Sequence, residues 1–193
     1  MRNQPFFITG LPRSRTAWMA VAATTADSVC KHEPTMHYAS FEALLEWWAA
    51  DVHVLRGVSD SGLGMMLPEI LNALGCRTLV VERPLEDVER SIYQLWDEHG
   101  VVGNQLLVRR RLNALAEVLA RHRRHRLVKV VDFDDLCSPH VVAEALDWIM
   151  PMVAAPNLRE LVRMNIQADL RYSLAHAYGS SQWWMPEALR GVA

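Results

Sequence analysis

The sequence predicts an α/β fold, a three-layer sandwich in which helices cover both faces of a central, mostly parallel sheet. Short apolar runs alternate along the chain with longer segments of helical periodicity, which is the pattern of repeated βαβ units. The runs at 79–81 and 128–131 are continuously apolar or nearly so, as in strands that are buried on both faces. The length of 193 residues suits one domain, 1–193, with a core over about 5–150 and a helical tail over about 151–193.

Each element follows from a local pattern. Apolar runs bounded by turn residues predict strands at 5–9, 28–32, 52–58, 77–82 and 126–132. Apolar residues that recur every three or four positions predict helices at 15–25, 39–50, 64–74, 84–99, 103–124, 139–149 and 157–177. Ligands of parallel sheets bind at the carboxyl ends of the strands. The loops after residues 9, 32, 58, 82 and 132 are therefore the expected place for a functional site.

Composition excludes several classes of protein. Hydrophobic residues make up 51% of the chain and charged residues 22%, as in a folded globular domain rather than a disordered chain. The 20 basic and 22 acidic side chains give a formal net charge of -2, so no overall basic field favours nucleic acid. No apolar run reaches the roughly 20 residues that span a bilayer. The chain has three cysteines, none of them in a CxxC pair: Cys30, Cys76 and Cys137. We therefore expect no metal site and no disulfide framework, and we expect a cytoplasmic location.

The loop after the first strand has the residue types of an anion site. Strand 5–9 leads through Gly10 into a helix whose beginning carries Arg13, Ser14 and Thr16. Free N–H groups and the positive end of the helix dipole favour a phosphate or sulfate there, and a guanidinium adds a bidentate donor. An ordinary turn capped by Ser14 is the alternative. The nucleotide-triphosphate signature GxxxxGK[ST] is absent, which weakens a kinase interpretation.

This loop resembles the PKSGTTW loop of the sulfotransferases that use 3′-phosphoadenosine 5′-phosphosulfate (PAPS), in which it cradles the 5′-phosphosulfate. The matched residues are Arg13, Ser14, Arg15, Thr16, Ala17 and Trp18. By resemblance, Arg13 takes the family's basic position, the two hydroxyl residues bind phosphate, and Trp18 lies close to the adenine. Arg15 and Ala17 stand where the family has Gly and a second Thr. Arg15 is strained if that position needs a positive φ, and supplies extra charge if it is helical.

A second sulfotransferase signature is a strand followed by RxPxDVxxS, in which the Arg and the Ser hold the 3′-phosphate of the nucleotide. Arg83 follows strand 77–82, and Ser91 lies eight positions later, about two turns into the next helix. Asp87 and Val88 also match. The resemblance therefore assigns the 3′-phosphate to Arg83 and Ser91, against the alternative of a surface arginine and an incidental serine.

The ends of two further strands carry matches. Phe133, in a stretch that resembles the family's YEDL, takes the place of the Tyr near the adenine. Glu33, after the second strand, matches the general base of several bacterial and carbohydrate sulfotransferases. The pKa of an ordinary Glu is near 4.3, so the site should raise it by burial. His32, with an ordinary pKa near 6.5, is the alternative base. Because adjacent strand residues point to opposite faces, we expect only one of the two to enter the site.

The resemblance covers about 5–150 in order. The tail matches no family segment, and its arginines Arg159, Arg163 and Arg171 are better explained as helix surface than as a closing loop over the 3′-phosphate. A strongly basic stretch at 109–126 is interpreted as a solvated helix face. Acidic acceptors or an oligomer contact are weaker explanations of it.

Together these features predict a PAPS-dependent sulfotransferase that acts on a hydroxyl or amine of a small-molecule or carbohydrate acceptor. Glu33 is expected to be the general base and Arg13 to stabilise the leaving group, with no metal needed. Two alternatives remain: a P-loop small-molecule kinase, and a non-catalytic nucleotide-binding protein of the same P-loop fold. We expect no nucleic-acid partner and no membrane span, and the sequence leaves a homodimer open.

Overall fold

The computed structural model describes residues 4–50, 53–151, 153 and 158 of the chain. Its five strands form one sheet in the order β2-β3-β1-β4-β5, and every neighbouring pair is parallel. The strands are β1 (Phe6–Gly10), β2 (Ser28–His32), β3 (Leu55–Ser59), β4 (Arg77–Glu82) and β5 (Val128–Asp132). The predicted α/β class is confirmed, and the sheet of the described residues is parallel throughout.

The helices lie close to their predicted positions. They are α1 (Thr16–Ala22), α2 (Phe41–Ala49), α3 (Leu67–Leu74), α4 (Leu85–His99), α5 (Gln105–His122) and α6 (Pro139–Ile149). Short 3-10 helices precede or follow them, namely η1 (Pro34–Met36), η2 (Gly62–Met66) and η3 (Asp134–Cys137). The predicted helix at 157–177, with Arg159, Arg163 and Arg171, lies outside the described residues apart from residue 158.

Two predicted helices are shorter in the structure, each for a local reason. The prediction began a helix at residue 64, but α3 begins at Leu67 with Pro68 in its first turn. Pro68 lacks the N–H that a helix begun at Gly64 would need, so this stretch is a 3-10 helix instead. At the end of α1, the Thr24 hydroxyl donates to the carbonyl of Ala20 at 2.9 Å. The Thr24 N–H donates instead to the Val21 carbonyl, three residues back, at 3.1 Å, so the α-helical pattern stops and α1 ends at Ala22.

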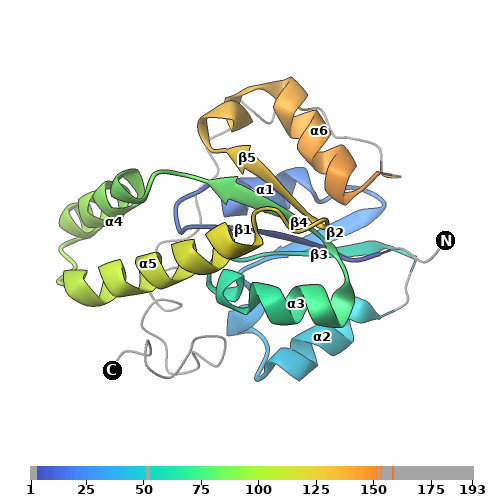
Figure 1. Cartoon of the computed structure of the whole chain (residues 1–193), viewed down its shortest axis with the longest axis horizontal. Helices are drawn as coiled ribbons and strands as arrows, with labels where there is room; N and C mark the ends of the chain where they lie inside the picture. The colour runs from blue at the N-terminus through green and yellow to red at the C-terminus, as the bar shows by residue number, and fades with distance from the viewer. Residues whose placement is uncertain (1–3, 51–52, 152, 154–157, 159–193) are drawn as a thin grey trace.

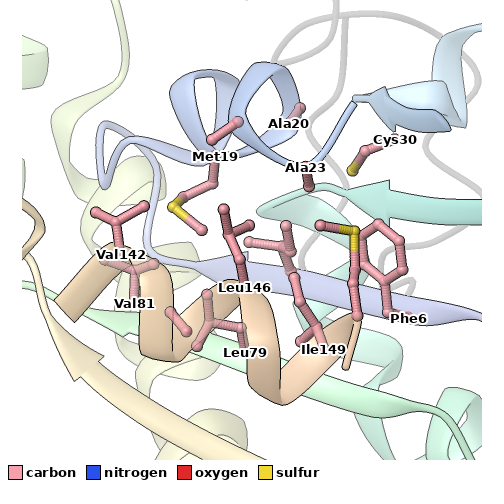
Figure 2. Close-up of a cluster of buried hydrophobic side chains, with 14 of the residues drawn as sticks. Phe6, Met19, Ala20, Ala23, Cys30, Leu79, Val81, Val142, Leu146 and Ile149 are labelled. Atoms are coloured by element: carbon pink, nitrogen blue, oxygen red, sulfur yellow. The ribbon is translucent and has the colours of Figure 1, made fainter. Parts of the chain in front are cut away.

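Helices cover both faces of the sheet, as the sandwich prediction requires. Figure 1 shows α1 and α6 on one side and α2, α3 and α5 on the other. Alternate residues of β1 supply the two cores: Phe6 and Ile8 pack with α1 and α6, whereas Phe7 packs with the opposite set. Figure 2 shows the first core, where Met19 of α1 and Leu146 of α6 meet over the strands.

Main-chain bonds extend the sheet past the carboxyl ends of its strands. The N–H of Glu33 donates to the Ser59 carbonyl at 2.9 Å, and the N–H of Asp60 donates to the Ile8 carbonyl at 3.0 Å. On the other side, the N–H of Phe133 donates to the Glu82 carbonyl at 2.8 Å. These bonds fix the backbone at the start of three of the five loops that the sequence analysis singled out, namely those after β2, β3 and β5.

The strand order also locates the site. The connection from β1 leads towards β2 on one side of the sheet, and the connection from β4 leads to β5 on the other. The loops after β1 and β4 therefore diverge at this edge of the sheet, which is where doubly wound sheets bind ligands. Among the described helices, none combines the length and the apolar character that a membrane span needs.

Candidate functional site

The loop between β1 and α1 requires a glycine at its start and strained residues further on. A Cβ on Gly10 would lie 2.5 Å from the backbone oxygen of Val81, so no larger residue lets the loop approach β4 this closely. Arg13 and Arg15 have φ values of 65° and 59°, in the left-handed region that favours glycine. The position at which the family has Gly therefore has a positive φ in this chain, and the backbone of Arg15 is strained. This is the first of the two conformations that the sequence left open for Arg15.

Ser14 occupies the centre of this loop and is an unusual residue there. Its side chain is fully buried, and its hydroxyl oxygen has no hydrogen-bond partner among the described residues. Ser14 does not cap α1, whose N-cap is Arg15 without a side-chain bond. A buried hydroxyl without a partner costs about 1–3 kcal/mol, which a ligand oxygen would recover.

Arg13, Arg83 and Ser91, which the sequence predicts for one nucleotide site, are in contact. The Nε of Arg13 donates to the Ser91 hydroxyl at 3.3 Å, across 78 positions of the chain. The Nη1 of Arg83 donates to the Arg13 carbonyl at 2.6 Å. The loop after β1 is thus tied both to the loop after β4 and to α4.

Phe133, the aromatic residue after β5, lies against the same arginines. The guanidinium carbon of Arg83 is 4.3 Å from the centre of its ring, and that of Arg15 is 4.7 Å away. Both terminal nitrogens of Arg15 also lie 3.3 Å from the Cys137 sulfur. These contacts hold two guanidiniums over one ring, at cation–π distance.

The site carries an excess of positive charge. Burial lowers the pKa of Arg83 from its ordinary value, and the charges of Arg13 and Arg15 lower it further. Asp87 and Asp134 act in the opposite direction. The three guanidiniums repel one another, and an anionic group of a bound ligand would reduce this repulsion.

Glu33 and His32 lie together near the start of α1, which corrects one expectation. Strand alternation predicted that only one of them would enter the site. Glu33, however, follows the end of β2 with φ of 45°, so the alternation ends at His32. The Nε2 of His32 lies 3.8 Å from the Glu33 carboxylate and 3.5 Å from the Thr16 hydroxyl. The two residues therefore form one unit beside α1.

Burial gives Glu33 the pKa that a general base needs. Its side chain is 13% exposed. Loss of solvation raises its pKa from 4.5 to about 8, and the charge of Asp60 contributes to the increase. A carboxylate with such a pKa is a far stronger base than an ordinary glutamate.

Asp60 is the site residue that the sequence analysis missed. It is fully buried after β3, in a Ser-Asp-Ser-Gly stretch that has the composition of an ordinary turn. Its Oδ2 accepts from the Thr35 hydroxyl at 3.1 Å, and its Oδ1 accepts from the Leu63 N–H at 3.0 Å. Its carbonyl accepts from the Thr9 hydroxyl at 2.9 Å. One aspartate thus joins β1, η1 and η2, and its charge acts on Glu33.

Thr16, Trp18 and Ala17 complete the set of predicted residues. The Thr16 carbonyl accepts from the Ser59 hydroxyl at 2.8 Å, which ties α1 to β3. Trp18 is 5% exposed and belongs to the core between α1 and α6, where its side chain offers little surface to a ligand. Ala17 is half-buried in the first turn of α1. The roles of Trp18 and Ala17 in nucleotide binding remain predictions.

Comparison with solved structures identifies the fold. A sulfotransferase from Alicyclobacillus acidocaldarius superposes with a TM-score of 0.58 and 15% sequence identity, over 100% of this chain and 97% of that one. The mouse sulfotransferase SULT7A1, solved in complex with PAP, superposes with a TM-score of 0.52 and 11% identity, over 92% of this chain and 65% of that one. The chain has the sulfotransferase fold. No protein-family model matches the sequence, and no curated protein matches it either.

The sulfotransferase fold was expected from a resemblance over about 5–150, with its main motifs at residues 13–18 and 83–91. The structural match covers 100% of the chain. At 15% and 11% identity, the match describes the path of the backbone. What the site binds has to be argued from its own residues.

Proposed function

We propose that this chain with the sulfotransferase fold transfers a sulfuryl group from PAPS to a hydroxyl or amine of a small-molecule or carbohydrate acceptor. The observation that carries the proposal is the buried Ser14 hydroxyl, without a partner among the described residues, on the loop that also holds Arg13 and Arg15. Arg83 contacts that loop directly. PAP, the desulfated form of the donor, is bound in the mouse protein of the same fold.

The residues divide between the two ends of the nucleotide. Ser14, Thr16 and Arg13 lie on the loop after β1 and suit the 5′-phosphosulfate, since hydroxyls and a guanidinium donate hydrogen bonds to its oxygens. Arg83 and Ser91, which Arg13 joins, suit the 3′-phosphate. Phe133, by its resemblance to the family's Tyr, would lie by the adenine.

The acceptor chemistry falls to Glu33 and Arg13. Bound PAPS supplies an activated sulfuryl group. Glu33 takes the proton of the acceptor hydroxyl or amine, which requires the ionised carboxylate, so the proposed activity rises as the pH increases towards the pKa of about 8. Arg13 stabilises the negative charge of the leaving phosphate. Binding of PAPS and the acceptor next to each other would align the acceptor atom with the sulfur.

Calorimetric titration with PAP tests the nucleotide assignment. The wild-type protein is expected to bind PAP well and 5′-AMP weakly, because only PAP carries the 3′-phosphate. Arg83→Ala should weaken PAP binding by about 10- to 100-fold, the worth of a lost charged hydrogen bond. The matched control is Arg90→Ala, since Arg90 is an exposed arginine of α4 that pairs with Asp87 and should leave the affinity unchanged.

The alternatives give different results in the same titration. ATP binding that needs Mg²⁺, with no response to PAP, would replace the proposal by the kinase alternative. Strong PAP binding without sulfuryl transfer to any acceptor in a broad screen would indicate a non-catalytic nucleotide-binding protein. Equal PAP affinity of wild type and Arg83→Ala would refute the assignment of the 3′-phosphate.

A further inference from the structure

Two arginines from different loops share one aromatic ring at the candidate site. Arg15 belongs to the loop after β1, and Arg83 follows the end of β4. Their guanidinium carbons lie 4.7 and 4.3 Å from the centre of the Phe133 ring, which follows β5. The ring therefore joins the two loops and brings two positive charges together. We call Arg15, Arg83 and Phe133 the arginine–ring group.

The positive charge of the arginine–ring group is not balanced by an ion pair within the described part of the chain. No carboxylate there lies at ion-pair distance from Arg15 or Arg83. Burial lowers the pKa of Arg83, and the charge of Arg15 lowers it further, so the two guanidiniums repel each other. Both side chains are half-buried, where water screens this repulsion less than at an open surface. An anion between them would remove the repulsion.

The hydrogen-bond donors of the two guanidiniums are only partly used by the protein. A guanidinium carries five N–H donors. Arg83 donates to the Arg13 carbonyl at 2.6 Å. Both terminal nitrogens of Arg15 face the Cys137 sulfur at 3.3 Å, and a thiol is a weak acceptor. The ring stabilises the charges but offers no oxygen, so a phosphate would supply the strong acceptors that these contacts lack.

Arg15 reaches this place from a strained backbone. Its φ of 59° and ψ of 21° lie in the left-handed region, which glycine adopts without strain. Its side chain makes no capping bond to α1, so no local hydrogen bond explains an arginine at this position. The contacts that the side chain does make are with Phe133 and Cys137, next to Arg83. Strain that is kept for a side chain at a binding site indicates a role in that site.

We propose that Arg15 and Arg83 bind the 3′-phosphate of the nucleotide together, with Phe133 as the positioning residue that holds both. This inference rests on the proposed function, because it takes the 3′-phosphate to lie at Arg83. It separates Arg15 from its neighbours on the same loop, Ser14 and Thr16, which serve the 5′ end. Because the ring already restricts the two side chains, they lose less conformational freedom when the phosphate binds. The arginine–ring group thus selects nucleotides that carry a 3′-phosphate.

Calorimetric titration of the full chain with three adenosine phosphates tests where Arg15 acts. PAP carries both phosphates, 5′-AMP carries only the 5′-phosphate, and 3′-AMP carries only the 3′-phosphate. Arg15→Gly removes the guanidinium and suits the left-handed backbone, so the variant should fold. It is expected to weaken PAP and 3′-AMP about tenfold and to leave 5′-AMP unchanged. Arg15→Lys keeps the charge but loses the two-pronged donor, and should retain part of the affinity.

Phe133→Leu tests the positioning role of the ring. The variant keeps an apolar side chain and removes the surface that holds the arginines. We expect weaker binding of PAP and 3′-AMP and unchanged binding of 5′-AMP, because the ring acts through Arg15 and Arg83. When both arginines are already replaced, in Arg15→Gly with Arg83→Ala, the further change Phe133→Leu should have little effect. A ring that acts by stacking on the adenine would instead weaken all three ligands alike.

The matched control is an arginine that packs on an aromatic ring elsewhere. Arg77 begins β4, at the opposite end of that strand from Arg83, and its guanidinium carbon lies 5.0 Å from the centre of the Trp148 ring. Arg77→Ala should leave the affinity for all three ligands unchanged. Thermal melts of each variant show whether it folds.

The outcomes distinguish this inference from the function on which it rests. If Arg15→Gly leaves PAP unchanged, or weakens 5′-AMP as much as PAP, Arg15 does not bind the 3′-phosphate and the inference is overturned. The proposed function then still stands if Arg83→Ala weakens PAP. If wild type binds PAP no better than 5′-AMP, both the inference and the nucleotide assignment fall. If 3′-AMP binds through both arginines but no acceptor is sulfated, the inference stands and the proposed function falls.

Discussion

Backbone strain in this protein is concentrated at individual residues of the candidate site. Among the described residues, the non-glycine positions with positive φ are Arg13, Arg15 and Glu33. Each costs of order 1 kcal/mol or more, and the surrounding hydrogen bonds must compensate for it. Two of these residues direct guanidiniums towards Ser91 and Phe133, and the third brings its carboxylate beside His32. The strain thus accompanies the very side chains that we assign to the site.

Glu33 gives a prediction about stability and pH. Its pKa is about 8 in the folded protein, above the ordinary value of 4.5, so the folded state retains a proton that the unfolded state releases. Between these pH values stability falls by up to about 1.4 kcal/mol per pH unit, and below 4.5 the penalty is absent. We expect Glu33→Gln, which cannot ionise, to be more stable than wild type at pH 8 and to lose this part of the pH dependence.

Urea unfolding of the ligand-free protein at several pH values measures this effect. Glu69→Gln provides the control, because Glu69 is an exposed carboxylate of α3 and its variant should follow the wild-type curve. Parallel curves for wild type and Glu33→Gln from pH 4.5 to 8 would show that the carboxyl group of Glu33 is not perturbed.

At the scale of elements, Asp60 connects segments that lie close to Glu33. Its carboxylate accepts from Thr35 of η1 and from Leu63 of η2, and its main chain bonds to β1 on both sides. Thr35 is 1% exposed and Leu63 is fully buried, so neither donor can turn to water when its acceptor is removed. The arrangement of β1, η1 and η2 therefore depends on one side chain.

Two substitutions at Asp60 separate its hydrogen bonds from its charge. Asp60→Ala removes the carboxylate that accepts from two buried donors, and we expect it to lower the free energy of unfolding by about 2–4 kcal/mol. Asp60→Asn keeps an oxygen for the Leu63 N–H and offers an amide to the Thr35 hydroxyl, so it should cost less. Both remove the charge that raises the pKa of Glu33 and should lower that pKa.

Urea unfolding gives the stabilities, and carbon NMR of labelled glutamate gives the pKa of Glu33. Asp97→Ala, at an exposed position of α4, serves as the control and should change stability by less than about 0.5 kcal/mol. Loss of stability without a change in the Glu33 pKa would limit Asp60 to a structural role.

At the scale of the whole molecule, the sheet is most stable at its centre. All five residues of β1 are buried, and β1 pairs with strands on both sides. β2 and β5 pair on one side only, and most of β5 is partly exposed. Because local opening is easiest where few buried contacts are lost, the edges should open without the centre.

Hydrogen exchange of the ligand-free protein tests this order. We expect the amides of β1 to exchange slowest, at the rate set by global unfolding, and those of β5 to exchange faster. The β4 amides that pair with β1 act as an internal reference for the centre. Equal protection of β1 and β5 would mean that the described sheet opens only as one unit.

The sequence alone determined the class of fold and nearly every element, because helix and strand periodicity are local properties. It missed the start of α3, where Pro68 lacks an N–H, and the end of α1, where the Thr24 N–H bonds three residues back instead of four. The two short motifs also predicted loops that the structure brings into contact. Their contact, between Arg13 and Ser91, follows from the parallel order of β1 and β4.

Only the tertiary structure decided the surroundings of Glu33. Strand alternation separated Glu33 from His32, and the positive φ of Glu33 brings them together. Asp60 resembles a turn residue in the sequence, yet burial makes it the neighbour that helps to raise the pKa of Glu33. Solvation and charge depend on neighbours that are distant in the sequence, and therefore on the folded arrangement.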